Sequence, residues 1–197
     1  MPKRTTGITT QSLSNFVIDA GAVYINYGLT GERLLGATRG GNTFTIEVEM
    51  REMEIDGLRH AVKGTKRVIS VAATITCNLL ELTAANLAVA LTGSDLSTFT
   101  PTGGTVATHD VIRRAREVGT MDYIENVAIV GKVNNATENF VGIIYNALSS
   151  GGLELGMEDE SESAIELTFT AHIDADDIAD DGTYEEAWEI RMPRVTA

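Results

Sequence analysis

The chain has 197 residues, of which 43% are hydrophobic, and a formal net charge of −13 at pH 7. This size and apolar content suit a folded β-rich protein with a substantial core and argue against disorder of the whole chain. An acidic chain repels nucleic-acid phosphates at long range, which disfavours a role in gripping DNA or RNA. The single cysteine, Cys77, excludes an intramolecular disulfide and is expected to be a small buried hydrophobe.

The charge is unevenly distributed along the chain. Residues 1–151 carry 13 Lys or Arg and 14 Asp or Glu, whereas residues 152–197 carry 2 and 14, a net charge of −12. No apolar run approaches the roughly 20 residues that a membrane-spanning helix needs, so we expect no membrane anchor. The basic side chains in residues 1–6 are followed by no apolar stretch, so we expect no secretory signal.

The start of the chain predicts an arm followed by short strands. Residues 1–15 are polar without periodicity and predict a flexible arm ahead of one β-sandwich domain over residues 16–197. Short apolar runs at 16–18 and 22–25 predict two strands, or a strand and a bend. The glycine-rich segment 36–41 lacks both the spacing of a phosphate-binding loop and a following helix pattern, so we expect turns there.

The longest β pattern spans residues 43–77. Its first arm predicts a strand with one apolar face, because polar side chains alternate with Phe44, Ile46, Val48 and Met50. The second arm, residues 68–77, also keeps its apolar side chains on one parity. Each arm exceeds the roughly 5 to 6 residues of a typical strand, so the hairpin tip is expected to project beyond the body of the domain.

The tip of this hairpin carries two local signals. The apolar parity changes after Glu52, which predicts a β-bulge near Arg51. Asp56-Gly57 predicts a type I′ turn, from which residues 58–63 return as part of the second arm before a pause at Gly64.

A short helix is predicted after the hairpin. Thr83 is a suitable N-cap, Gly93 a natural stop, and the apolar face is expected to be formed by Ala84, Leu87, Ala88 and Leu91. The composition of residues 93–119 predicts a long excursion with one short element around 109–118. The basic cluster there is expected to contact the acidic C-terminal third of the chain, with a nucleic-acid patch as the less favoured alternative; it consists of Arg113, Arg114 and Arg116.

Four further strands are predicted, at residues 123–133, 140–148, 163–173 and 187–192. With the earlier segments they give about eight or nine strands and one short helix. The predicted fold is therefore mainly β: a β-sandwich or open barrel with a flanking short α-helix and a long projecting β-hairpin.

Few residues are arranged as a chemical site requires. The three histidines, His60, His109 and His172, lie on different elements without metal-pair spacing, and no Gly-x-Ser-x-Gly motif occurs. A Ser/His/Asp set assembled in space stays open. The acid-rich segment 174–182 departs from the EF-hand order, so a solvated loop is expected there, with a calcium site as the alternative.

The order of elements resembles that of a known family. The features that carry the resemblance are the Gly-Ala-Thr-Arg-Gly-Gly turn at 36–41, the long hairpin with Asp56-Gly57 and Lys63-Gly64, the helix start Leu79-Leu80-Glu81-Leu82-Thr83 and the strand at 167–174. Over residues 16–192 the chain is similar to the tail tube (major tail) proteins of long-tailed bacteriophages. Members of this family, and the similar inner-tube proteins of type VI secretion systems, share a β-sandwich with a flanking helix. They form hexameric rings that stack into a hollow tube through which the genome leaves the virion.

The resemblance implies a structural virion protein and no enzyme. It implies a homo-oligomer of rings stacked head to tail, assembled in the cytoplasm of a bacterial host, with other tail proteins as partners: the tape measure, terminator and distal tail proteins. No catalytic residue, cofactor or metal is expected, and DNA passes through without specific binding.

Two sets of residues suit that role. The hairpin segment 51–67 has a net charge of +2, opposite in sign to the C-terminal third, so we expect it to stack rings through Arg51, Asp56, Gly57, Arg59, His60, Lys63, Lys66 and Arg67. An acidic bore would let DNA slide, and the acids on the polar sides of the best strands, which we expect to face the lumen, are Glu47, Glu49 and Glu166. Sheet edges would be buried between neighbours in a ring.

Two functions of other classes stay open. One is a calcium-dependent β-sandwich module that recognises sugars or a cell surface, with Asp176, Asp177 and Asp181 as candidate ligands. The other is a jelly-roll hydrolase that uses a pair of carboxylates, although acids are too abundant in this chain to single out any pair.

Overall fold

The structure is a computed structural model that describes residues 6–8, 12, 16–17, 19–114, 117–134, 136–157, 159, 162–179 and 183–194. In this part of the chain the strands are β1 (Ala22–Ile25), β2 (Arg33–Leu34), β3 (Thr38–Glu52), β4 (Lys66–Leu79), β5 (Ser94–Phe99), β6 (His109–Arg114), β7 (Ile124–Lys132), β8 (Asn139–Ser149), β9 (Ile165–Thr170) and β10 (Trp188–Arg191). One α-helix, α1 (Ala84–Ala90), and the 3-10 turns η2 (Thr120–Asp122) and η3 (Ala175–Asp177) complete the described elements. The fold is mainly β with antiparallel pairing and one short α-helix, which confirms the predicted fold class.

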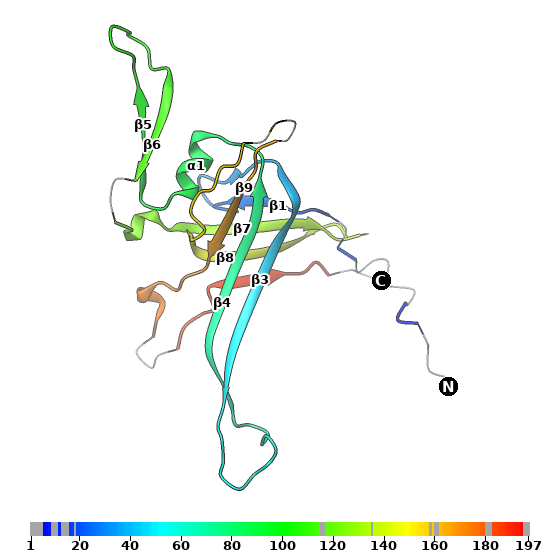
Figure 1. The fold of residues 1–197 in the computed structure, drawn as a ribbon. Helices are drawn as coiled ribbons and strands as arrows, with labels where there is room; N and C mark the ends of the chain where they lie inside the picture. The colour runs from blue at the N-terminus through cyan, green and yellow to red at the C-terminus, as the bar shows by residue number, and fades with distance from the viewer. Residues whose placement is uncertain are drawn as a thin grey trace.

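The long strand β8 joins two layers of sheet. The strand order is β2-β1-β7-β8-β9-β4-β3, and β10 also pairs with β8. Most of β8 pairs with β7, whereas its last residues, Leu148 and Ser149, pair with β9. The β7–β8 layer therefore crosses the β9–β4–β3 layer, as Figure 1 shows.

The core lies between these two layers. Buried side chains of β1, β7 and β8 meet those of β4 and β9, among them Val23, Val127, Ile144, Ile75, Leu167 and Phe169. Burying side chains of this size gives about 1.5–3 kcal/mol each, so the layer contact is the main source of stability. A second cluster on β7 and β8 consists of Ala128, Val141 and Ile143, with Tyr27 and Tyr145 packed against it.

Helix α1 begins where predicted, and Leu87 of the predicted apolar face packs against the core, although the most buried positions of the helix are others. The Thr83 hydroxyl accepts a hydrogen bond from the Asn86 N–H at 3.2 Å, so the N-cap prediction is correct. The fully buried residues of the helix are Asn86 and Ala90, and neither belongs to the predicted apolar face. Asn86 can be buried because a polar side chain is stable in the interior when its donors and its acceptor are all hydrogen-bonded.

Asn86 ties α1 to the segments beside it. Its amide nitrogen donates to the carbonyl oxygens of Leu35 at 2.9 Å and Glu81 at 3.0 Å. Its amide oxygen accepts from the Arg33 guanidinium at 2.7 Å. Burial lowers the pKa of the Arg33 guanidinium.

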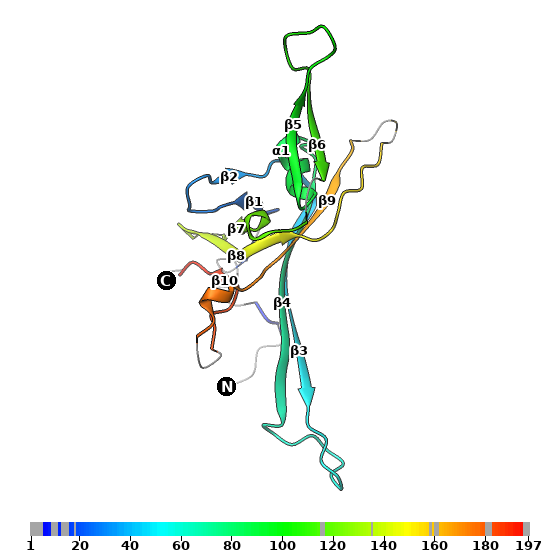
Figure 2. The ribbon, with the colours of Figure 1, turned by 90° about the vertical axis from the view of Figure 1, so that its left-hand side faces the viewer.

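The β3–β4 hairpin projects far beyond the body, as predicted (Figures 1 and 2). Two details of the prediction are wrong. A bulge does occur beside Arg51, but Glu49 pairs with Ser70 and Met50 with Val68, so the extra residue is Ile69 of the partner strand β4. The parity change after Glu52 arises because β3 ends there and a loop, residues 53–65, begins.

The turn at the tip is also of another type. The Leu58 N–H donates to the Ile55 carbonyl at 3.3 Å, and Gly57 has φ +87° whereas Asp56 does not have a positive φ. A positive φ at the third residue alone defines a type II turn, whereas a type I′ turn needs it at both central residues. Residues 58–63 therefore do not return as a strand, and pairing resumes only at Lys66.

A second hairpin, β5–β6, was not predicted. The sequence indicated one short element near 109–118, but Ser94–Phe99 pairs along its whole length with His109–Arg114. This hairpin projects from the end of the molecule opposite to the β3–β4 tip (Figures 1 and 2). The structure thus has one projecting ribbon at each end.

The N-terminal prediction is tested only in part. Most of residues 1–15 lies outside the described residues. Val17 forms a single bridge with Val133, and the first strand of the sheet is β1.

Candidate assembly surfaces

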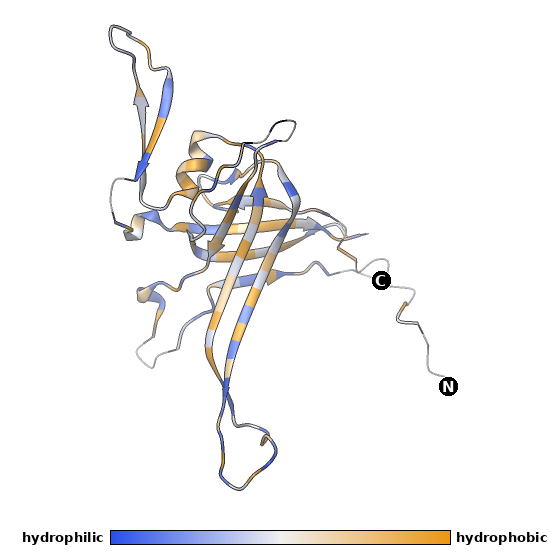
Figure 3. Ribbon diagram, in the orientation of Figure 1, coloured by the Kyte–Doolittle hydropathy of each residue, from blue (hydrophilic) through white to orange (hydrophobic). Residues whose placement is uncertain are grey.

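An apolar stripe runs along one face of the β3–β4 hairpin and leaves the core. Its cross-strand pairs, from the body outward, are Phe44 with Ile75, Ile46 with Ala73, Val48 with Val71, and Met50 with Val68. Ile75 is fully buried, whereas Val48 is 45% and Met50 58% exposed. Figure 3 shows hydrophobic positions alternating along both strands well below the body. The same alternation that builds the core therefore continues where nothing in the described chain covers it.

The loop at the tip adds further apolar surface. Residues 53–65 expose Met53, Ile55, Leu58 and Val62. Few backbone hydrogen bonds hold this loop, among them Met53 N–H to the Thr65 carbonyl at 3.2 Å and Thr65 N–H to the Val62 carbonyl at 3.2 Å. Residues 52–62 surround a hollow of about 530 Å³. A loop of this shape is suited to docking against another surface more than to packing on its own body.

All eight residues predicted to stack rings lie on this hairpin and are exposed. Arg51, Lys66 and Arg67 stand at the ends of β3 and β4, and the other five, Asp56, Gly57, Arg59, His60 and Lys63, lie in the loop. Lys66 lies 3.9 Å from Glu52. Among the described residues, no ion pair engages the other four cations of this segment.

The three predicted lumen acids lie on one face of the β9–β4–β3 layer, the face away from the core. Glu47 pairs with Ala72, Glu49 with Ser70 and Glu166 with Asn78, which places all three on the same side of the layer. Hydroxyl side chains from all three strands lie on this face, which we call the acidic threonine face: Thr43, Thr45, Ser70, Thr74, Thr76, Thr168 and Thr170. The Ser70 hydroxyl donates to Glu49 at 3.1 Å, and the Thr76 and Thr168 hydroxyls are 3.3 Å apart.

The basic cluster of β6 is not placed against the acidic third of the chain. Arg113 lies opposite Asp95 and Arg114 opposite Ser94 on the neighbouring strand, while Arg116 lies outside the described residues. The prediction that this cluster contacts the acidic C-terminal third is therefore wrong for Arg113 and Arg114, because the unpredicted strand β5 lies beside them. Exposed apolar side chains also occur at this end of the molecule, at Leu96, Phe99 and Val106.

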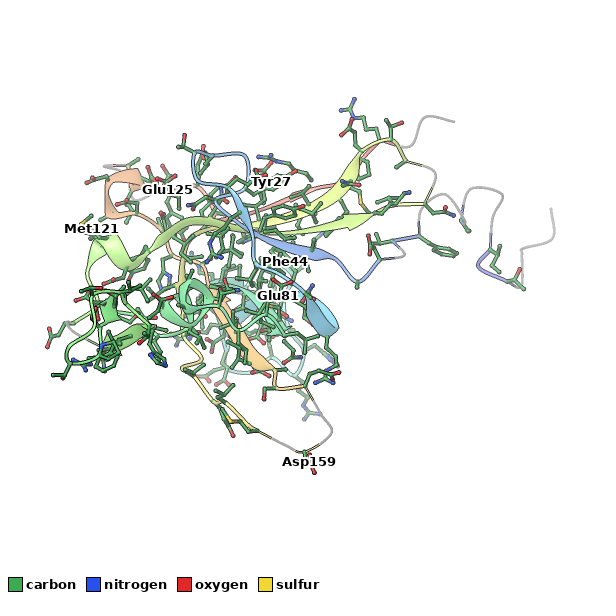
Figure 4. The ribbon with its side chains drawn as sticks, turned by 90° about the horizontal axis from the view of Figure 1, so that it is seen from above. Tyr27, Phe44, Glu81, Met121, Glu125 and Asp159 are labelled. Carbon is green, nitrogen blue, oxygen red and sulfur yellow. The ribbon has the colours of Figure 1, made fainter. Side chains whose placement is uncertain are left out.

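The connection between β8 and β9 lies at the same end as β5–β6 (Figures 1 and 2). Seen from above in Figure 4, Asp159 lies at the edge of the molecule, whereas Phe44 and Glu81 lie near its middle. Arg39 of β3 is bonded to Glu162 in this connection, at 3.2 Å to the carboxylate and 2.8 Å to the backbone carbonyl. Glu154 and Asp159 are exposed.

An acid-rich hollow of about 520 Å³ lies beside β10. Its polar centre is a chain of hydrogen bonds: the Tyr145 hydroxyl donates to Glu189 at 2.8 Å, and Arg191 donates to the same carboxylate at 2.9 Å. The hydrogen bonds from Arg191 and from Tyr145 lower the pKa of Glu189. Burial, followed by the bond to Glu189, raises the pKa of Tyr145.

The three histidines remain apart, as their spacing indicated. His60 is in the hairpin loop. His109 on β6 and Phe99 stack edge to face, and so do His172 and Tyr123, whose ring centroids are 5.1 Å apart. Within the described residues no three His, Cys, Asp or Glu side chains are grouped so as to hold a metal ion. Of the candidate calcium ligands, Asp176 and Asp177 lie on η3, and Asp181 lies outside the described residues.

No protein-family model matches this chain, and no curated protein sequence matches it. Among the described residues, no helix is long and apolar enough to cross a membrane.

Proposed function

We propose that this protein is a structural subunit that assembles with copies of itself into stacked rings and forms the tail tube of a long-tailed bacteriophage, with DNA as the cargo that passes through. The observation that carries this proposal is the apolar stripe of β3–β4, which continues from the core to the exposed Val48, Met50 and Val68. Larger apolar patches on a soluble chain mark interaction sites. A ribbon that extends the stripe away from the body needs a partner outside its own chain.

The placement of the two hairpins favours a partner of the same kind. They project from opposite ends, so copies can join head to tail through two different surfaces. Contacts between unlike surfaces propagate and give rings or filaments, whereas a two-fold contact of like surfaces closes after two copies. Stacking through the hairpin is therefore consistent with a tube.

The sheet edges suit contacts within a ring. Strand β3 is at one end of the strand order and β2 at the other, so each has a strand neighbour on one side only among the described strands. Exposed edges pair readily with another chain, and closing a ring would cover them.

The acidic threonine face is suited to line the bore. Its acids are Glu47, Glu49 and Glu166, and the next pair outward on the same face is Arg51 and Arg67. Along the stretch from Glu166 to Glu49, phosphates would meet hydroxyl groups and negative charge, which do not bind them. In this proposal the tape measure, terminator and distal tail proteins are the partners at and within the tube.

The stripe can be tested with substitutions that leave the core intact. In the variant V48D/M50D/V68D each change lies at an exposed position, so the isolated subunit should keep its melting temperature within a few degrees. Wild-type protein should sediment as large assemblies at high concentration, and the variant should remain a single subunit because a buried carboxylate opposes the contact.

The matched control is M121D, a change from Met to Asp at the 93% exposed Met121 of η2, away from the hairpin. This control should assemble as wild type does. Unimpaired assembly of the triple variant would contradict the role given to the stripe, and a wild-type protein that never assembles, even with its tail partners, would contradict the proposed function.

A further inference from the structure

Two arginines face each other across the β3–β4 hairpin. Arg51 of β3 is directly opposite Arg67 of β4, and both are exposed. Like charges directly opposite each other in an antiparallel pair destabilise the hairpin. Since no carboxylate among the described residues is bonded to either guanidinium, the isolated subunit leaves this repulsion in place.

The neighbouring cross-strand pair, by contrast, joins opposite charges. Glu52 is opposite Lys66, with their charged atoms 3.9 Å apart. One step closer to the body, the same strands carry two cations. The arginine pair therefore provides two planar guanidinium groups, each able to bind a carboxylate through two hydrogen bonds, at the outer end of the paired stem beside the loop 53–65.

The opposite end of the molecule carries the complementary charge. Between residues 154 and 162 the chain has five acidic residues and no Lys or Arg. Of these, Glu154 and Asp159 are exposed, while Glu162 is already bonded to Arg39. The connection that holds them lies at the end away from the hairpin tip (Figures 1 and 2), and Asp159 points away from the body in Figure 4.

We infer that the arginine pair Arg51–Arg67 of one copy binds the carboxylates of Glu154 and Asp159 of a copy in the next ring. The inference rests on the proposed function, and it specifies which surface receives the hairpin. The pairing relieves the repulsion between the arginines only when rings stack head to tail, so it sets the polarity of the tube. The other acid-rich segment, around η3, lies on the same side of the β7–β8 layer as the hairpin tip (Figures 1 and 2), where a head-to-tail neighbour would not bring its arginines.

The test is a charge swap in the full-length chain. The variant R51E/R67E should raise the concentration needed for assembly at least about tenfold, since it sets acids against acids. The variant E154K/D159K should do the same. A chain carrying all four substitutions should assemble at a concentration within about threefold of wild type, because each contact is again between opposite charges.

The control with the same change in net charge is K132E/R194E, whose two exposed cations lie away from the hairpin. It should assemble as wild type does. If wild type forms tubes but R51E/R67E assembles normally, or if its defect is not rescued by E154K/D159K, the pairing is wrong while the proposed function stands. If wild type forms no assembly at all, the proposed function itself fails.

Discussion

At the scale of single residues, the polar groups of this protein are used to fix elements in place. Asn86 makes its hydrogen bonds to Arg33, Leu35 and Glu81 and so holds α1 against the start of the sheet. Glu189 has a comparable role beside β10, where it joins Tyr145 to Arg191. In both cases one side chain connects segments that are distant in the sequence, which a reading of local patterns does not reveal.

The hydrogen bonds to Glu189 predict a pH dependence of stability. Because Arg191 and Tyr145 lower the pKa of Glu189, its ionised form stabilises the folded chain. This contribution is fully present above the ordinary pKa of 4.5 and is lost as the pH falls through the lowered value. The variant E189Q should therefore be less stable than wild type at pH 7, by a few tenths of a kcal/mol since the pair is exposed.

Urea unfolding of the isolated subunit at pH 7 and near pH 3 would measure this difference. The two proteins should converge in the free energy of unfolding at the lower pH. A difference that stayed constant between the two pH values would show that the ionisation of Glu189 contributes nothing. The variant E186Q is a suitable control, because it makes the same change at an exposed glutamate that takes no part in that chain of hydrogen bonds.

At the scale of elements, the β3–β4 hairpin has a stable stem and a separable tip. The stem is paired from Asn42–Cys77 outward to Glu52–Lys66, whereas residues 53–65 form a loop with few internal hydrogen bonds. The apolar side chains of this loop contribute nothing to the buried core. Stability and assembly should therefore be separable here.

A shortened hairpin tests this separation. Replacing residues 53–65 by Asn-Gly, which suits a two-residue turn between the paired Glu52 and Lys66, removes the exposed loop and leaves every core contact. The isolated subunit should melt at the wild-type temperature or slightly above it, since a shorter loop loses less entropy on folding. Assembly should be lost. A shortened chain that assembles as wild type does would show that the tip makes no contact between rings.

The elements also show which parts of the fold the sequence could predict. The alternation from Phe44 to Met50 is local and strong, so the long hairpin was predictable. Strand β5 was not, because Ser94–Phe99 mixes serine, threonine and acid without one apolar face and is exposed on nearly its whole length. The bulge at Ile69 was assigned to the wrong strand, since only the pairing register shows which strand carries the extra residue.

The candidate assembly surfaces, like the fold, could be predicted from the sequence only in part. Net charge indicated the basic hairpin, and strand parity placed Glu47, Glu49 and Glu166 on one face. That Arg51 lies directly opposite Arg67 depends on the pairing register of β3 and β4, so it is seen only in the structure. The position of the β8–β9 connection at the far end depends on the path of the whole chain, which no local pattern contains.

At the scale of the whole molecule, the subunit has two different ends. The β3–β4 tip at one end is apolar and basic, and the other end carries β5–β6 and the acidic connection between β8 and β9. Between them, the acidic threonine face runs along the β9–β4–β3 layer. An object with unlike ends and one acidic side is suited to form a polar tube with an acidic bore.

The most direct measurement is electron cryo-microscopy of the wild-type protein at high concentration, followed by three-dimensional reconstruction. We predict stacked rings in which each β3–β4 tip reaches the next ring near Glu154 and Asp159, with Glu47, Glu49 and Glu166 around the bore. Particles that remain single subunits with the hairpin uncovered, or closed dimers joined by like surfaces, would contradict it.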